Sequence, residues 1–181
     1  MVGVNTYIQQ ISFNGISYTK GTVVDPLQSF HIIAKDFPFK IYPEPKDLPT
    51  RDWIGEDGLD VYIPDVLPMK QYDIEVTFLY SRERTQQVTD ETIRAEMTAF
   101  IEFIYGREKG AQSDSVKSAR LAIYNEYTGI GRKDVVVTGI SNDVFFLNES
   151  DNDVVAEFKV KFSVYDPVTK VTKSGNNLVW S

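Results

Sequence analysis

The sequence has 181 residues with no cysteine, one histidine and a net charge of −7, and 42% of its residues are hydrophobic. The lack of cysteine excludes disulfides, thiolate metal sites and cysteine nucleophiles, and the acidic charge argues against specific nucleic-acid binding, which relies on Lys and Arg at phosphates. No apolar run approaches the roughly 18 residues of a membrane helix and no basic-then-apolar leader opens the chain, so we expect a soluble, unsecreted protein with no membrane partner.

The N-terminal part of the chain predicts strands. A hairpin is expected over residues 7–18, because Asn14-Gly15 between alternating apolar residues favours a type I′ turn with positive φ at both central positions. A further strand is predicted over residues 30–35. It contains the single histidine, His31, for which we expect a structural role, since one imidazole alone cannot build a histidine metal site or a triad.

Residues 43–68 form a long loop with five of the eight prolines and many acidic residues. Because proline restricts φ, such a loop is stiffer than a Gly/Ser linker and can serve as an extended arm. Large apolar side chains surrounded by polar ones are typical of interface anchors. We therefore predict a protein interface formed by Asp52, Trp53, Ile54, Leu59, Tyr62 and Ile63. The alternative, equally open, is that Trp53 and Tyr62 fold back to cover the edge of their own sheet.

The second half of the chain predicts more strands and one helix. Alternating or short apolar runs predict strands over residues 72–80, 119–123, 135–137, 144–147 and 154–165. The helix is expected to begin at its cap Thr89 and to end near Gly106, followed by a polar linker to residue 118. Its apolar stripe consists of Ile93, Met97, Phe100, Ile101 and Ile104.

These elements together predict the fold class. Many strands with turn signals between them and one amphipathic helix favour a mainly β (α+β) protein, an antiparallel β-sandwich or barrel with one packed α-helix. We expect a single domain over residues 1–181, with the extended loop at about 43–68 as its main irregular feature.

No motif for catalysis or cofactor binding stands out. The densest acidic group lacks the ligand spacing and fixed glycine of a calcium loop; it comprises Asp52, Glu56, Asp57, Asp60 and Asp65. Residues 129–132 lack the third glycine of a dinucleotide motif and are better interpreted as a hairpin turn. Asp134 is expected to pair with Arg132 or Lys133 on the surface. We therefore predict no enzyme activity, no cofactor and no metal.

The order of elements resembles the tail tube and distal tail proteins of long-tailed bacteriophages and prophages, and residues 51–64 with 72–76 look like prophage tail proteins. The resemblance implies a structural protein that forms a homo-oligomeric ring, commonly a hexamer, whose sheets join into a barrel around a channel. The long loop would reach the next subunit or ring, and other tail proteins would be further partners. The implied location is the virion tail, assembled in the cytoplasm of the bacterial host.

Two further expectations accompany this resemblance. Distal tail proteins often carry a second, C-terminal domain, whereas this sequence ends at Ser181, which favours a tail tube or connecting ring. The main alternative function is a non-catalytic carbohydrate- or protein-binding β-sandwich module, in which Trp53, Tyr62 and Tyr72 would present a stacking surface for sugars. An enzyme of unknown type ranks third.

Overall fold

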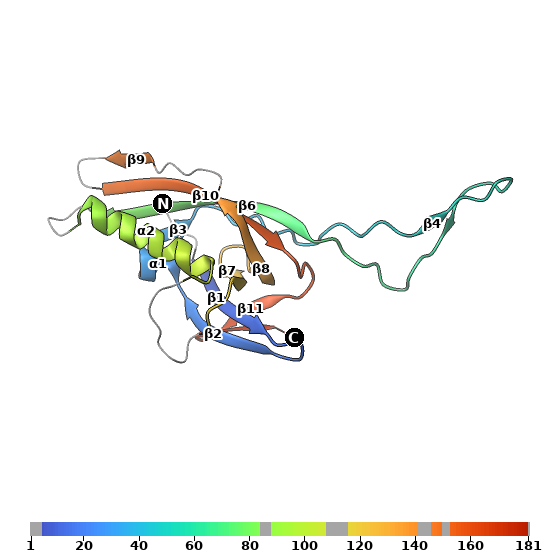
Figure 1. The fold of residues 1–181 in the computed structure, drawn as a ribbon, viewed down its shortest axis with the longest axis horizontal. Helices are drawn as coiled ribbons and strands as arrows, with labels where there is room; N and C mark the ends of the chain where they lie inside the picture. Colours follow the sequence, from blue (N-terminus) through green and yellow to red (C-terminus); the bar gives the residue numbers. More distant parts are fainter. Residues whose placement is uncertain (1–4, 84–87, 108–115, 141–145, 150–152, 181) are drawn as a thin grey trace.

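The fold is given by a computed structural model that describes residues 5–83, 88–107, 116–140, 146–149 and 153–180 (Figure 1). Within these residues the chain is mostly antiparallel β-structure with two helices, which confirms the predicted mainly β fold. In chain order the elements are β1 (Thr6–Phe13), β2 (Tyr18–Val24), α1 (Pro26–Phe30), β3 (Ile32–Ala34), β4 (Thr50–Arg51), β5 (Asp60–Val61), β6 (Tyr72–Glu83), α2 (Asp90–Ile104), β7 (Arg120–Asn125), β8 (Ile130–Ile140), β9 (Phe146–Glu149), β10 (Asp153–Val164), β11 (Val171–Ser174) and β12 (Asn177–Trp180). Residues 108–115 of the predicted linker and 144–145 of a predicted strand lie outside the described part.

The main sheet contains eight of the described strands, in the order β2-β1-β7-β8-β10-β6-β3, with β9 also paired to β10. Strand β10 pairs with β6 along its whole length. On its other edge, β8 pairs with the C-terminal part of β10 from Val160 onward, and β9 pairs with the N-terminal part up to Glu157. The predicted alternation in the two long strands is confirmed by their buried side chains, which include Ile74, Val76, Phe78, Tyr80, Phe158, Val160, Phe162 and Val164.

Helix α2 packs on this sheet with one apolar face. It begins after Thr89, whose Oγ1 accepts a hydrogen bond from the backbone N–H of Thr92 at 3.3 Å, so the predicted N-cap is confirmed. The ring centroid of Phe100 lies 5.1 Å from that of Phe78 and 6.1 Å from that of Phe158. The helix therefore contributes directly to the core formed by β6 and β10.

The short helix α1 is absent from the sequence prediction. Asp25 caps it, with its Oδ1 accepting a backbone hydrogen bond of the first turn at 2.9 Å, and Pro26 follows. These are ordinary start signals, but five residues are too few to show a helical period. The predicted strand begins at Ile32 instead of Phe30, because Phe30 ends α1 and His31 takes a left-handed conformation with φ of 57°.

Helix α1 changes which flank of α2 is buried. The ring centroids of Phe30 and Phe103 are 5.8 Å apart, and Phe103 is buried. Ile101, which the sequence places on the apolar stripe, is only half-buried. The predicted stripe is therefore wrong at Ile101 and misses Phe103, because helical periodicity does not show which flank a second helix will cover.

His31 lies at the junction of α1, α2 and the sheet. Its Nδ1 is 3.1 Å from Oε2 of Glu96 on α2. The same carboxylate accepts hydrogen bonds from the Tyr80 hydroxyl at 2.6 Å and from the Arg82 guanidinium. Burial and the hydrogen bond to Glu96 raise the pKa of Tyr80 to about 12. The single histidine thus takes part in a network that joins three elements.

The first hairpin is confirmed, but the predicted type I′ turn is wrong. Four residues connect β1 and β2, and of the Asn-Gly pair only Gly15 has positive φ. Asn14 Oδ1 accepts hydrogen bonds from the backbone N–H groups of Ile16 at 2.9 Å and Ser17 at 2.8 Å. The asparagine side chain therefore organises this loop as an Asx turn.

The C-terminal hairpin of β11 and β12 is also absent from the sequence prediction. Its two-residue turn is Gly175-Asn176, a dipeptide that does favour hairpins, and Gly175 has φ of 58°. The hairpin covers the second face of β1 and β7, where a small separate core consists of Ile11, Ala122, Val171 and Leu178.

Gly131 lies within β8 instead of in the predicted turn, and a Cβ there would lie 2.5 Å from the carbonyl oxygen of Val171. The close approach of the hairpin therefore requires glycine.

Candidate interaction surface

The long loop between β3 and β6 is an arm that projects away from the sheet (Figure 1). We use "the arm" for residues 44–69 and "the body" for the other described residues. The two legs of the arm run antiparallel near the body: the N–H of Lys46 donates to the carbonyl of Pro68 at 2.7 Å, and the N–H of Lys70 donates to the carbonyl of Glu44 at 2.8 Å. The arm is therefore a narrow two-legged ribbon held by backbone hydrogen bonds.

The distal part of the arm is a small hairpin. Strands β4 and β5 pair in register, and the N–H of Tyr62 donates to the carbonyl of Pro49 at 3.2 Å. The Trp53 indole N–H donates to Asp60 Oδ2 at 2.9 Å, and the Arg51 guanidinium lies 4.4 Å from the Trp53 ring centroid. These local contacts, together with the prolines, give the hairpin its shape without any contribution from the body.

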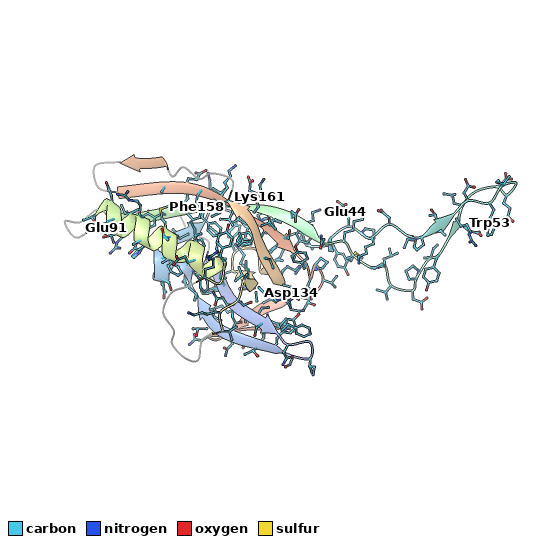
Figure 2. The ribbon with its side chains drawn as sticks, in the orientation of Figure 1. Glu44, Trp53, Glu91, Asp134, Phe158 and Lys161 are labelled. Atoms are coloured by element: carbon cyan, nitrogen blue, oxygen red, sulfur yellow. The ribbon has the colours of Figure 1, made fainter. Side chains whose placement is uncertain are left out.

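The six residues predicted to form an interface lie together in this distal part, and Figure 2 shows Trp53 far from the body. All six are exposed, and the side chain of Ile54 is fully so, at 107% of its reference area. The alternative, in which Trp53 and Tyr62 fold back over their own sheet, is therefore wrong for this structure. The prediction misses five further exposed apolar residues of the same loop and its base, which the same composition signal could have found: Ile41, Tyr42, Val61, Val66 and Leu67.

The base of the arm is fixed to the body by Arg132 of β8. Its side chain is buried, and its guanidinium donates hydrogen bonds to the carbonyls of Lys40 at 3.0 Å, Ile41 at 3.2 Å and Gly131 at 2.9 Å. Pro43, the residue immediately before the arm, is also buried. Sequence reasoning missed this role, because nothing in the pattern around Arg132 shows that its guanidinium bonds two carbonyls that are 92 and 91 positions away in the chain.

The predicted surface pairing of Asp134 is wrong in its location. Asp134 pairs with Lys133 at 3.2 Å and with Arg120 at 3.4 Å, and it accepts a hydrogen bond from the Tyr18 hydroxyl at 2.7 Å. Lys133 is buried and lies 2.7 Å from Asp166. Burial alone would raise the pKa of Asp166, but its hydrogen bonds from Lys133 and from Thr169 lower that pKa below 3.8. This network joins β8 to the segment that leads into the C-terminal hairpin.

Charge is distributed unevenly between the arm and the body. The arm contains seven acidic and two basic side chains, a net charge of −5 out of the −7 of the whole chain.

Neither helix in the described residues has the length and hydropathy to cross a membrane. In the same part of the chain, no three His, Asp or Glu side chains converge as ligands for a metal ion.

The aromatic residues proposed for sugar stacking do not form one surface. Tyr72 is only 8% exposed and lies at the start of β6, where the Lys40 ammonium is 5.5 Å from its ring centroid. Trp53 and Tyr62 lie on the distal arm, and one face of Trp53 is covered by Arg51. The structure therefore separates the three side chains on which that alternative depends.

No family model and no curated protein matches the chain. Among solved structures, the chain is similar to the Dit (gp 19.1) protein of SPP1, described as a paradigm of the hub adsorption apparatus in phages that infect Gram-positive bacteria. The TM-score is 0.49 and the sequence identity is 10%, over 92% of this chain and 52% of that one. The chain thus spans about half the length of that structure.

Proposed function

We propose that this protein is a structural component of a long-tailed bacteriophage or prophage tail, as a tail tube, connecting ring or distal tail protein, and that it acts by assembling into a ring. The observation that carries this proposal is the arm. It holds a cluster of large apolar side chains away from the body, where no part of the described chain covers them (Figure 2).

Exposed apolar clusters of this kind are characteristic of protein interaction sites. Burial against a partner would stabilise the complex by about 25 cal/mol for each Å² of apolar surface removed from water. The prolines and backbone hydrogen bonds of the arm reduce the conformational entropy lost on docking. The arm is therefore suited to binding another protein chain without first having to fold.

The ends of the sheet support the self-assembly part of the proposal. Within the described residues, β2 and β3 are terminal strands that pair on one side only. Such edges invite pairing with another chain, and a closed ring of identical subunits satisfies them without open-ended growth. The sequence resemblance of residues 51–64 and 72–76 to prophage tail proteins gives the proposal its biological setting.

The remaining expectations belong to the same proposal. The role is structural and non-catalytic and requires no cofactor. The partners are further copies of this chain, with a hexamer as the expected ring, and other tail proteins. The site of action is the virion tail, after assembly in the host cytoplasm. The acidic charge would allow DNA to pass a channel without being retained, because like charges provide no counterion-release affinity.

The test is to delete residues 50–64 and to compare the variant with the full chain by sedimentation and negative-stain electron microscopy. We expect rings from the full chain and loss of rings from the variant, with unchanged circular dichroism of the body. Tyr127→Ser, at an exposed tyrosine in the turn between β7 and β8, is the control and should retain rings. Rings that survive the deletion, or a full chain that remains monomeric at high concentration and binds glycans, would refute the proposal.

A further inference from the structure

The loop between β1 and β2 holds a pair of residues that the proposed function does not use. Asn14 is the one asparagine of the sequence that is followed by glycine. Asparagine is among the chemically labile side chains of proteins, because its amide carbon can be attacked by the backbone nitrogen of the next residue. Glycine at that next position leaves the attacking nitrogen unhindered, since it has no Cβ. The pair is therefore a candidate site of covalent modification.

Both reacting nitrogens are open to solvent. Asn14 and Gly15 are exposed, and a Cβ built on Gly15 would meet no atom within 4 Å. Among the residues that the structure describes, neither the backbone N–H of Gly15 nor the side-chain NH₂ of Asn14 makes a hydrogen bond. The nitrogen that has to attack and the nitrogen that has to leave are thus both accessible to water.

The side-chain oxygen of Asn14, in contrast, is held by two donors, the N–H groups of Ile16 at 2.9 Å and Ser17 at 2.8 Å. The bond from Ile16 closes a ring of atoms that contains both Asn14 Cγ and the Gly15 nitrogen, so the side chain is folded over the backbone at Gly15. The same two N–H groups would stabilise negative charge on Oδ1 when a nucleophile adds to Cγ, as the donors of an oxyanion hole do. The loop therefore supports attack on its own asparagine.

We propose that Asn14 converts spontaneously to aspartate and isoaspartate through a succinimide formed with Gly15. The Gly15 nitrogen, after losing its proton to solvent, forms a bond to Asn14 Cγ, and the π electrons of the side-chain carbonyl move to Oδ1. They return as the bond from Cγ to Nδ2 breaks, and Nδ2 takes up a proton and leaves as ammonia. Water then adds to one of the two ring carbonyl carbons and opens the ring. The conversion consumes water, releases ammonia and needs no oxidant, reductant or enzyme.

The two products would change the first hairpin differently. Aspartate keeps an acceptor for both N–H donors and adds one negative charge to the loop. Isoaspartate places the former side-chain carbons in the main chain and so lengthens the connection that sets the pairing of Phe13 with Tyr18. Because β2 is a terminal strand of the sheet within the described residues, the modification lies at a sheet edge.

The test is to incubate the full chain at mildly alkaline pH and to map its peptides by mass spectrometry, which detects the exchange of ammonia for water at each asparagine. We expect Asn14 to be modified first, with both products separated by chromatography. Asn176 is the internal control, because it is exposed in the turn between β11 and β12 but is followed by Asn177, whose side chain hinders attack. An intact Asn14, or earlier modification of Asn176, would overturn the inference.

Ser17→Pro tests the part played by the two donors, because it removes one N–H that binds Oδ1. The variant should react about fivefold more slowly, since a hydrogen bond strengthens as its acceptor gains charge. Ser17→Ala keeps the N–H, is the matched control and should react at the wild-type rate. In concentrated urea all three chains should react at one rate, because the loop is then unfolded. Faster reaction of Ser17→Pro in buffer, or an equal slowing in urea, would show that the two hydrogen bonds do not promote the conversion and would overturn the inference.

Discussion

In the body, the side chains of Phe78, Phe100 and Phe158 are fully buried, whereas in the arm the side chain of Ile54 is fully exposed to solvent. The body is stabilised by the burial of its own side chains between β6, β10 and α2. The arm contains no core and takes its shape from prolines, backbone hydrogen bonds and a few side-chain contacts. The difference shows that stability and interaction are separated in this chain, so substitutions in the two regions should have separable effects.

The largest expected effect on stability is that of Phe158→Ala. Removing this fully buried ring should lower the free energy of unfolding by about 3–5 kcal/mol, because the cavity lies between the rings of Phe78 and Phe100. Denaturant titration measures the change. Lys159→Ala, on the opposite face of the same strand, is the control, and a cost below about 1 kcal/mol for Phe158→Ala would contradict the packing described here.

Arg132→Met tests the link between the two regions. The variant leaves three carbonyl oxygens, those of Lys40, Ile41 and Gly131, without their buried donor. We expect a loss of about 3 kcal/mol in unfolding free energy and faster proteolysis between residues 39 and 43, because the base of the arm is released. Arg94→Met on the exposed face of α2 is the control. Unchanged proteolysis would show that other contacts hold the arm in place.

Asp166→Asn tests the half-buried network of the body. The variant should lose about 2 kcal/mol at neutral pH, because Lys133 loses a charged partner. The pKa of Asp166 is lowered in the folded state. The contribution of this carboxylate to the free energy of unfolding is therefore complete at pH above 3.8 and is lost as pH falls below that value. The wild-type chain should therefore lose more stability than the variant when pH is lowered through this range. Asp65→Asn, at an exposed carboxylate of the arm, is the control and should leave the free energy of unfolding at neutral pH unchanged.

The smallest expected effect on stability accompanies a large effect on assembly. Tyr62→Ser in the arm should change the unfolding free energy by less than about 0.5 kcal/mol, because the side chain is exposed and touches no core. The same variant should weaken self-association by about tenfold or more if the arm carries an interface anchor. Sedimentation velocity measures this effect. A substantial loss of stability without a change in association would reverse the distinction between arm and body.

Much of the body follows from local patterns. Alternation identified β6 and β10, the cap at Thr89 identified the start of α2, and Asn14-Gly15 identified the first hairpin. The misses have a common physical cause. Helix α1 is too short to show a period, and the burial of Phe103 in place of Ile101 depends on where α1 lies. The two-faced burial of β7, with Leu121, Ala122 and Ile123 all covered, depends on the C-terminal hairpin.

By itself, the sequence determined that residues 43–68 are rich in proline, acidic and interspersed with apolar side chains, because these properties belong to the residues themselves. Only the tertiary structure decided that this segment leaves the body instead of folding back over it, and that Arg132 holds its base. Both outcomes depend on groups that are distant in the chain: the aromatic core already covers its own sheet, and the buried guanidinium finds carbonyls that only the folded backbone brings within reach.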